Sequence, residues 1–257
     1  MILDKVTLVA VSSIKINETI QALENSMKGV EYAEVLLISH EQPINLPNNI
    51  KFKKCRRLNS IDAYNWFMIF ELAKYVETEF ALVVQHDGYV LNPDKWTDDF
   101  LNYDYIGAPW PPQTFFDKTG QEIRVGNGGF SLRSKKLLSV FNDLDLPFDN
   151  DVTSFPSEDA VICVYHRSAL ENYGIKFAPV ALASAFSREF NCNDSSQKTF
   201  GFHFHPTSHF IKSKNTRNSL KEVFKMWIKK IIPRVVINKG KALFLENVRR
   251  GIDINKI

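Results

Sequence analysis

The stretch Phe80-Ala81-Leu82-Val83-Val84-Gln85-His86-Asp87-Gly88-Tyr89 decides the fold class. Its first five residues are all apolar and do not alternate with polar ones, a pattern typical of a strand that is buried on both faces. Strands of this kind form the centre of parallel sheets that helices cover. The polar residues that follow would lie at the carboxyl end of this strand, where open α/β sheets bind their ligands.

The segments around this strand alternate between strand and helix patterns. Before it, apolar runs predict strands at 6–11, 34–39 and 50–53, and helical spacing predicts helices over 17–27 and 60–76, with Asn17 and Ser60 as caps. After residue 100 we expect short strands at 105–108, 129–132, 175–179 and 181–186, helices at 135–142 and 158–173, and a long loop at 109–126. The fold class is therefore α/β, with a mixed, mostly parallel central sheet flanked by helices.

Composition excludes several classes of protein. Of the 257 residues, 44% are hydrophobic and 24% are charged, which excludes disordered and collagen-like chains. No apolar run approaches the ~20 residues of a membrane span, and the apolar N-terminus contains Asp4 and no cleavage site, so we expect a strand there and no signal peptide. Cys55, Cys163 and Cys192 are widely spaced, which predicts reduced thiols in a cytoplasmic protein and no zinc site or disulfide framework.

Charge divides the chain into two parts. Residues 211–257 hold 13 Lys and Arg but 3 Asp and Glu, whereas residues 1–210 hold 19 and 26. We therefore expect a domain over 1–210 and a basic tail of amphipathic helices over 211–257. In the tail, residues 212–241 suit an anionic membrane surface, and packing of the apolar face on the core is the alternative. No basic platform with interleaved aromatic residues is present, so we expect no nucleic-acid contact.

Four short motifs could carry chemistry, and each also has a structural explanation. Asp87 could hold a divalent metal against phosphates, or Asp87-Gly88 could simply be a turn. The glycines of 126–129 would let the backbone approach a ligand closely, or would form an ordinary turn that enters a strand. Glu158 and Asp159 could supply a general base, or could start a helix that Ser157 caps. His203 and His205 would lie on the same side of a strand, as metal ligands or as structural histidines.

Taken in this order, the motifs resemble the GT-A class of nucleotide-sugar glycosyltransferases. They are most similar to a group of small bacterial and viral members with QxD, YDYIGAPW, GNGGxSLRS, ED and FGxH motifs. The matching segments here are Gln85-His86-Asp87, 103–110, 126–134, Glu158-Asp159 and Gly201-Phe202-His203. The resemblance covers roughly residues 5–210, and the tail lies outside it.

The resemblance implies a GT-A, Rossmann-like fold and a role for each motif. Asp87 and His203, with His205 as a rival to His203, would bind Mn²⁺ or Mg²⁺ beside the diphosphate of a nucleotide sugar, with a UDP-sugar favoured. Gln85 stands where the family has its first acid. The remaining implied site residues are Asp159 as the base with Glu158 as second choice, Gly128 and Gly129 at the sugar pocket, and Ala10 and Ser12 beside the nucleotide base.

The implied function is metal-assisted transfer of a sugar to an acceptor hydroxyl with inversion. The acceptor would be a glycan or a lipid-linked sugar of polysaccharide biosynthesis, met by a cytoplasmic or peripheral membrane enzyme. Because Gln85 replaces an acid, an inactive glycan- or nucleotide-binding module of the same fold is the alternative. A nucleotidyltransferase would need a glycine-rich basic loop after the first strand, where this chain has Ser12-Ser13-Ile14-Lys15.

Overall fold

The computed structural model describes residues 1–117, 119–148, 157–189 and 198–203. Three of the sequence predictions lie outside these described residues: the metal-ligand role of His205, the free thiol of Cys192 and the amphipathic tail over 211–257. Among the described residues, no helix is both long enough and apolar enough to span a bilayer.

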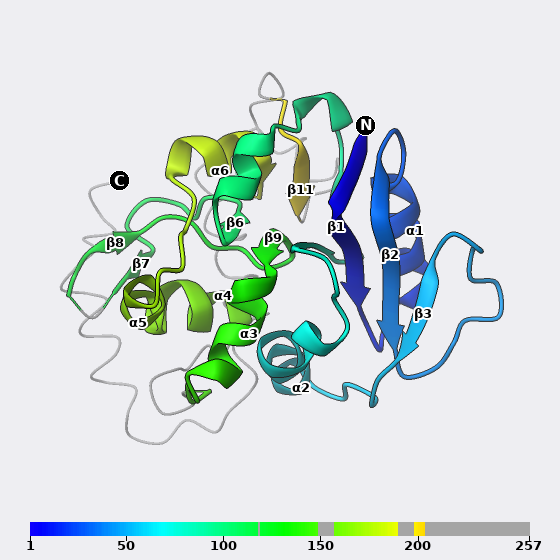
Figure 1. Ribbon diagram of the computed structural model, residues 1–257, viewed down its shortest axis with the longest axis horizontal. Helices are drawn as coiled ribbons and strands as arrows, with labels where there is room; N and C mark the ends of the chain where they lie inside the picture. Colours follow the sequence, from blue (N-terminus) through cyan, green and yellow to red (C-terminus); the bar gives the residue numbers. More distant parts are fainter. Residues whose placement is uncertain (118, 149–156, 190–197, 204–257) are drawn as a thin grey trace, which may run out of the picture. The chain divides into compact units, whose positions relative to one another are not determined.

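A six-stranded sheet, with the strand order β3-β2-β1-β4-β9-β6, forms the centre of the described domain (Figure 1). In that order the strands are Lys51–Lys54, Glu31–Ser39, Ile2–Val11, Phe80–Val84, Phe130–Ser134 and Tyr105–Gly107. The pairs β3/β2, β2/β1 and β1/β4 are parallel, whereas β9 runs antiparallel to both β4 and β6. The predicted mixed, mostly parallel sheet is confirmed.

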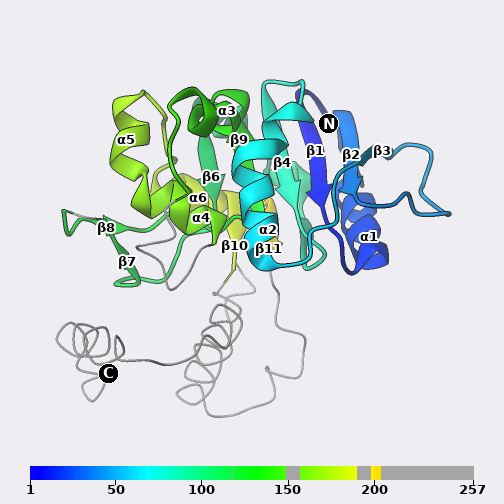
Figure 2. The same ribbon diagram turned by 90° about the horizontal axis from the view of Figure 1, so that it is seen from below.

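Helices connect these strands (Figure 2). The α-helices are α1 (Ile16–Ser26), α2 (Ile61–Trp66), α3 (Lys135–Asp143), α4 (Glu158–Ala160), α5 (Arg167–Asn172) and α6 (Val180–Phe186). Two π-helical segments continue α2 and α4, namely η1 (Phe67–Glu71) and η5 (Val161–Tyr165), and the 3-10 helices are η2 (Leu72–Lys74), η3 (Pro93–Lys95) and η4 (Asp98–Asn102).

Five short strands complete the described secondary structure in two small sheets. β10 (Ser187–Arg188), β11 (Gly201–His203) and β5 (Gly88–Val90) form one sheet, and β7 (Phe115–Phe116) pairs with β8 (Glu122–Ile123) in the other. The segment predicted as a loop over 109–126 therefore contains a β-hairpin.

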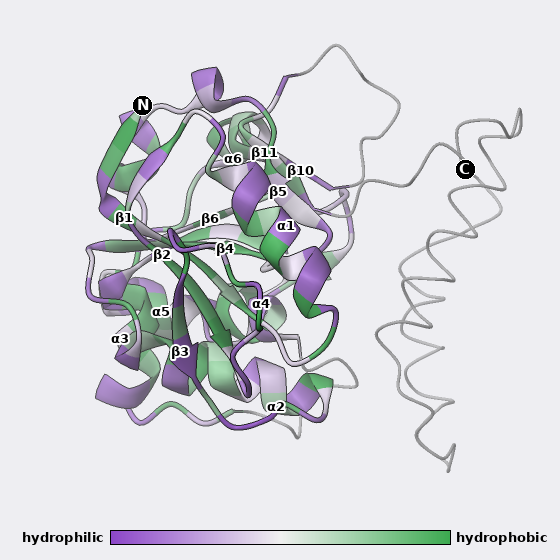
Figure 3. Cartoon of the chain, turned by 90° about the vertical axis from the view of Figure 1, so that its right-hand side faces the viewer, coloured by the Kyte–Doolittle hydropathy of each residue, from purple (hydrophilic) through white to green (hydrophobic). Residues whose placement is uncertain are grey.

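The two faces of the central sheet are covered by different helices. Side chains alternate along each strand, so neighbouring residues enter different layers. Leu8 and Leu82 pack with Leu23 of α1 on one face, whereas Val9 and Val83 pack with residues of η1, η2 and α3 on the other. Figure 3 shows the hydrophobic colouring concentrated along these central strands. Cys55 and Cys163 are buried free thiols in the clusters of this core.

Two predicted strands are wrong. Residues 181–186 belong to helix α6, which begins after Pro179. The segment is rich in alanine, the best helix former. The prediction failed because a short apolar run does not distinguish a buried strand from a helix. Residues 175–179 contribute one isolated bridge, between Phe177 and Tyr105, and no strand.

The predicted helix starts had different outcomes. Ser60 is the predicted cap of α2, and its hydroxyl accepts a hydrogen bond from the Ala63 amide at 3.1 Å. Asn17 is not a cap, because α1 begins one residue earlier, after Lys15 in a left-handed conformation with φ 48°. Ser157 occupies the N-cap position of α4 but makes no capping hydrogen bond with its side chain.

Candidate functional site

The turn that holds Asp87 follows directly on the central strand β4. The Gly88 amide donates to the Gln85 carbonyl at 3.1 Å, which closes a tight turn with Asp87 in its middle. The Gln85 side-chain amide donates to the Tyr64 hydroxyl at 2.8 Å and so ties the turn to α2. Asp87 therefore lies at the carboxyl end of β4, as the sequence predicted, with a side chain that is 20% exposed.

Strand pairing brings His203 to this turn. β5 begins at Gly88 and runs antiparallel to β11, and in their register His203 lies opposite Gly88. A Cβ at Gly88 would lie 2.7 Å from the Phe202 carbonyl oxygen and 3.2 Å from His203 Cδ2, so the close approach requires glycine. His203 Nε2 lies 3.3 Å from Asp87 Oδ1.

His203 lies between two carboxylates. Its Nδ1 is 3.3 Å from Glu189 Oε1, a contact that the sequence analysis missed because Glu189 belongs to no motif. Burial by itself lowers the pKa of His203, but its contacts with Asp87 and Glu189 outweigh burial and raise the pKa to about 9. Without a bound metal, the ring is therefore a cation at neutral pH.

The Asp87 and His203 pair fits a divalent cation. Two adjacent ligands of an octahedral ion, each at about 2.1 Å, are about 3 Å apart, and the 3.3 Å between Asp87 Oδ1 and His203 Nε2 is close to that separation. Both contacts of the ring are longer than the about 2.7–2.9 Å of a short charge-assisted hydrogen bond. The described residues contain no group of three His, Cys, Asp or Glu that could hold a metal, so phosphate and water oxygens would have to complete the coordination.

The glycine-rich turn, residues 126–129, lies between the Asp87 and His203 pair and the acidic pair Glu158-Asp159. It precedes β9, as predicted, and Asn127 turns the chain there with φ 62°. A Cβ at Gly129 would lie 2.2 Å from His203 Nε2, and a Cβ at Gly128 would lie 2.0 Å from Glu158 Oε1. The backbone of Gly128 and Gly129 therefore lies between His203 and the acidic pair at the start of α4.

The two acids of that pair have different surroundings. Glu158 is 5% exposed, and its Oε1 lies 3.0 Å from Nη2 of the fully buried Arg133. Arg133 Nη2 also donates to the Gly128 carbonyl at 3.3 Å. Asp159 is half-buried, and its Oδ2 accepts a hydrogen bond from the Gly128 amide at 3.1 Å.

The two acids also differ in their electrostatic surroundings. Burial raises the pKa of Glu158, and the charge of Asp159 adds to the shift, whereas Arg133 opposes it. Glu158 is thus a buried group whose carboxylate is tied to Arg133. Asp159 is the more exposed member of the pair, and it contacts the glycine-rich turn.

The loop after β1 lies beside the Asp87 turn. Lys15 Nζ is 2.9 Å from His86 Nε2, which puts a cation next to the turn, although neither residue was a predicted site residue. Of the two residues predicted at the nucleotide base, Ser12 is half-buried and bonds to the Ile14 carbonyl. Ala10 is fully buried in the core, backbone included.

The motif at 103–110 packs against the glycine-rich turn. A Cβ at Gly107 would lie 2.0 Å from the Gly126 carbonyl oxygen, and a Cβ at Gly126 would lie 2.0 Å from the ring of Trp110. Trp110 is also joined to Arg124, whose carbonyl accepts from the Trp110 amide at 2.7 Å. The motifs at 85–87, 103–110, 126–129, 158–159 and 201–203 therefore form one contiguous region.

The family model described as "Protein of unknown function (DUF5672)" matches residues 47–203, more than half of the chain. A comparison with curated protein sequences finds no match.

Solved structures of glycosyltransferases are similar to this chain. One, involved in the glycosylation of the major capsid of PBCV-1, has 14% identity and a TM-score of 0.41 over 86% of this chain and 98% of that one. The mannosyltransferase PcManGT from Pyrobaculum calidifontis, in complex with GDP-Man and Mn²⁺, has 10% identity and a TM-score of 0.41 over 67% of this chain and 53% of that one. GlyE of Streptococcus pneumoniae has 11% identity and a TM-score of 0.45 over 88% of this chain and 63% of that one.

Proposed function

The chain belongs to the DUF5672 family, and we propose that it is a GT-A-type glycosyltransferase that moves a sugar from a nucleotide-sugar donor to an acceptor hydroxyl with inversion. The observation that supports this proposal is the contact of one glycine pair with two sets of reactive side chains. Gly129 lies against His203, the partner of Asp87, and Gly128 donates its amide hydrogen to Asp159. The part of the site that binds the donor and the part that binds the acceptor would therefore adjoin at Gly128 and Gly129.

In the donor half, Asp87 and His203 would hold Mn²⁺ or Mg²⁺. The ion would neutralise the charge that develops on the diphosphate leaving group. The imidazole must lose its proton to become a ligand, so metal binding would compete with the ion pairs of His203. Lys15, 2.9 Å from His86, would add a positive charge on the β1 side of the same diphosphate.

In the acceptor half, Asp159 would act as the general base. A carboxylate oxygen of Asp159 would take the proton from the acceptor hydroxyl while the oxygen of that hydroxyl attacks the sugar. The Gly128 amide holds Oδ2 at 3.1 Å and thereby orients the carboxylate. Glu158 is less suited to this role, because its carboxylate is buried against Arg133.

We favour a UDP-sugar as donor and a glycan or lipid-linked sugar of polysaccharide biosynthesis as acceptor. The basic residues of 212–241 would hold a cytoplasmic enzyme at an anionic membrane surface, where such an acceptor is found.

One observation favours a second candidate function, a glycan- or nucleotide-binding module without activity. Gln85 occupies the place of the first acid, and its amide is engaged by the Tyr64 hydroxyl at 2.8 Å. A single carboxylate and a histidine bind a divalent ion more weakly than a site with two carboxylates. A binding module would retain ligand affinity with little dependence on metal and without turnover.

A thermal-shift screen of UDP- and GDP-sugars, with and without Mn²⁺, tests the proposal. A ligand at 100 times its dissociation constant adds about 2.7 kcal/mol to the free energy of unfolding, which is a measurable shift in Tm. We expect one nucleotide sugar to stabilise the full chain in a Mn²⁺-dependent way and to release its nucleoside diphosphate on incubation. Stabilisation without release, even with a panel of glycan acceptors, would support the binding module instead.

A further inference from the structure

The imidazole of His203 has a second carboxylate neighbour, Glu189, which has no role in the proposed reaction. Glu189 Oε1 lies 3.3 Å from Nδ1 of the ring, and Asp87 Oδ1 lies 3.3 Å from Nε2. The side chains of His203 and Glu189 are each 12% exposed, so water has little access to their contact. The two nitrogens of one ring therefore contact two different acidic residues.

Strand pairing places Glu189 at this position. In the small sheet β11 is the middle strand, between β10 and β5. β10 is parallel to β11 with Arg188 opposite Phe202, so the next residues along the two chains, Glu189 and His203, lie side by side. The contact therefore follows from strand register, as the contact with Asp87 does on the other side of β11.

The Nε2 atom is the ring nitrogen that faces the proposed site. A Cβ at Gly129 would lie 2.2 Å from Nε2, and Asp87 contacts the same atom. A nitrogen that binds a metal carries no proton, and a neutral imidazole has one N–H group. With Nε2 as the ligand, the proton must be on Nδ1, where Glu189 lies within reach as its acceptor.

The charges of these groups balance around a divalent cation. A neutral His203 leaves one negative charge on Asp87 and one on Glu189, and the two positive charges of the ion neutralise them. Buried charges persist in proteins where they are paired or coordinate a metal. Histidines that bind metals almost always donate their other N–H to a carboxylate, a carbonyl or a water. Glu189 has the contact and the burial that this arrangement requires.

We propose that Glu189 is a positioning residue, which accepts the Nδ1–H hydrogen bond of His203 and so holds the ring with Nε2 toward Asp87. When the cation of the proposed function is bound, this arrangement would present the unprotonated Nε2 to it. The role toward the cation rests on the proposed function, whereas the orientation of the ring does not.

The contact also has a second interpretation with the opposite consequence. An ion pair with Glu189 stabilises the protonated ring, and a proton on Nε2 excludes a metal. If that were its whole effect, removal of the Glu189 side chain would strengthen metal binding. If Glu189 positions the ring, its removal weakens metal binding.

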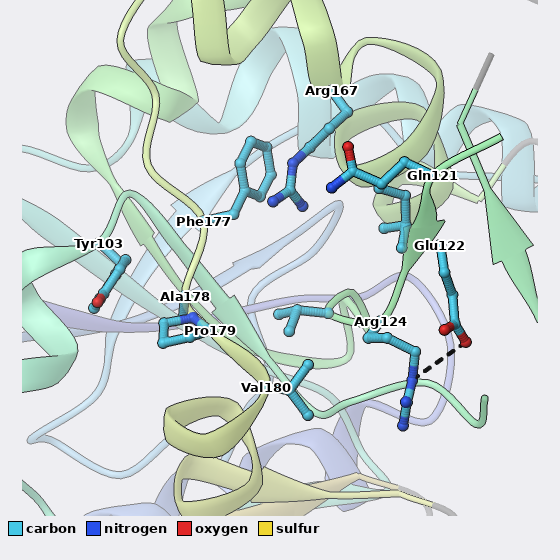
Figure 4. Close-up of a pocket in the computed structure, with 11 residues that line it drawn as sticks. Tyr103, Gln121, Glu122, Arg124, Arg167, Phe177, Ala178, Pro179 and Val180 are labelled. Atoms are coloured by element: carbon cyan, nitrogen blue, oxygen red, sulfur yellow. Dashed lines mark ion pairs between the residues drawn. The ribbon is translucent and has the colours of Figure 1, made fainter. Parts of the chain in front are cut away.

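Two variants separate the hydrogen bond from the charge. Glu189→Gln and Glu189→Ala both remove the negative charge, but the glutamine retains an oxygen that can accept from Nδ1. Glu122→Ala is the matched control, because Glu122 is also a partly buried carboxylate in an ion pair, with Arg124 (Figure 4). Glu122 lines a cavity of about 340 Å³ whose lining residues include neither Asp87 nor His203 nor Glu189.

The first measurement is a Mn²⁺ titration of the full chain with UDP or GDP present, with the free ion followed by EPR. We expect Glu189→Ala to lose about 10- to 100-fold in Mn²⁺ affinity, the usual effect of removing such a partner of a metal-binding histidine. Glu189→Gln should lose less, and Glu122→Ala should bind as the unchanged protein does. Mn²⁺ affinity in a folded Glu189→Ala that equals or exceeds that of the unchanged protein would overturn the inference.

The second measurement locates the ring proton without metal. ¹⁵N spectra of histidine-labelled protein distinguish the two neutral tautomers of imidazole, and the spectrum of His203→Gln assigns the signals. At a pH above the pKa of His203, which is about 9, we expect Glu189→Ala to lose population with the proton on Nδ1. Glu189→Gln should retain more of that population, and Glu122→Ala should retain all of it. The same tautomer population in Glu189→Ala and the unchanged protein would contradict the positioning role.

The inference and the proposed function fail separately. A shift of the tautomer in Glu189→Ala, in a protein that binds no Mn²⁺, would retain the positioning of His203 and remove the metal from the proposed function. Mn²⁺ and nucleotide binding that are the same with and without the Glu189 side chain would retain the proposed metal site and remove the role of Glu189.

Discussion

His203 lies directly opposite Gly88 in the antiparallel pair of β11 and β5. Because Gly88 follows Asp87 in the turn after β4, this register carries the histidine to 3.3 Å from the Asp87 carboxylate. Two residues more than a hundred positions apart in sequence thus become neighbours through three short strands. A one-residue slip in the register would turn the His203 side chain to the other face of the small sheet.

The first prediction concerns the metal. Asp87→Asn retains the size of the side chain but removes its charge, so we expect Mn²⁺-enhanced binding of nucleoside diphosphates to be lost while Tm changes little. Calorimetric titration of UDP and GDP with and without Mn²⁺ measures this. Asp94→Asn, at an exposed carboxylate paired with Lys95, is the matched control and should bind normally. Equal affinity of Asp87→Asn and the unchanged protein for UDP and GDP, with metal present, would rule out Asp87 as the ligand.

The second prediction separates the two acids at the start of α4. Asp159→Asn should lower kcat by about 10²–10⁴-fold with donor binding almost unchanged, because it removes the proposed base. Glu158→Gln should lower kcat less and lower Tm more, because it weakens a buried ion pair. Steady-state kinetics and melting curves of both variants decide the roles. The opposite pattern would make Glu158 the base, and two active variants would remove the inverting mechanism.

The third prediction concerns the glycine pair. A Cβ at Gly129 would lie 2.2 Å from His203 Nε2, so Gly129→Ala should displace the imidazole and abolish metal-dependent nucleotide binding. Gly120→Ala is the control, because no atom lies within 4 Å of a Cβ there. That control introduces local strain from φ +84°, so its Tm can fall, but its nucleotide binding should not. Normal metal dependence in Gly129→Ala would show that His203 is not a ligand.

The fourth prediction concerns the buried ion pair below the turn. Arg133→Met leaves the carboxylate of Glu158 buried without its cation, and we expect the free energy of unfolding to fall by about 3–5 kcal/mol. The double change Arg133→Met with Glu158→Leu should recover part of that loss, because neither charge then remains. Urea denaturation measures both, with Arg57→Met at an exposed position as control. If the double variant were as unstable as the single one, loss of the cation would not be the cause.

The fifth prediction concerns the basic tail and rests on sequence alone. Each Lys or Arg near an anionic leaflet contributes about 1 kcal/mol, and salt screens this attraction. The full chain should therefore co-sediment with anionic vesicles at low salt and be released at high salt. A chain truncated at residue 212 should not co-sediment, and its Tm should be normal. A large fall in Tm on truncation, without vesicle binding by the full chain, would show instead that the tail packs on the core.

The central layer of the fold could be predicted because its signals are local. The apolar runs at β1, β2 and β4 are long enough to be strands. Because these strands are buried on both faces, their sequences are apolar without the alternation of a half-exposed strand. Residues 181–186 show the limit of this reasoning. Their apolar run suits a strand or a buried helix equally, and the helix that forms after Pro179 packs its Phe186 into the core.

The site divides in the same way. The amino-acid sequence by itself determined that a carboxylate would follow the central strand, that glycines would precede β9, and that two acids would start a helix, because each statement concerns residues that are neighbours in the chain. Only the tertiary structure decided which of these groups meet. It placed His203 and Glu189 about one imidazole ring, tied Glu158 to Arg133 and left Asp159 at the turn. The physical reason is that strand register and buried ion pairs depend on contacts between distant segments, and no periodicity within one segment encodes them.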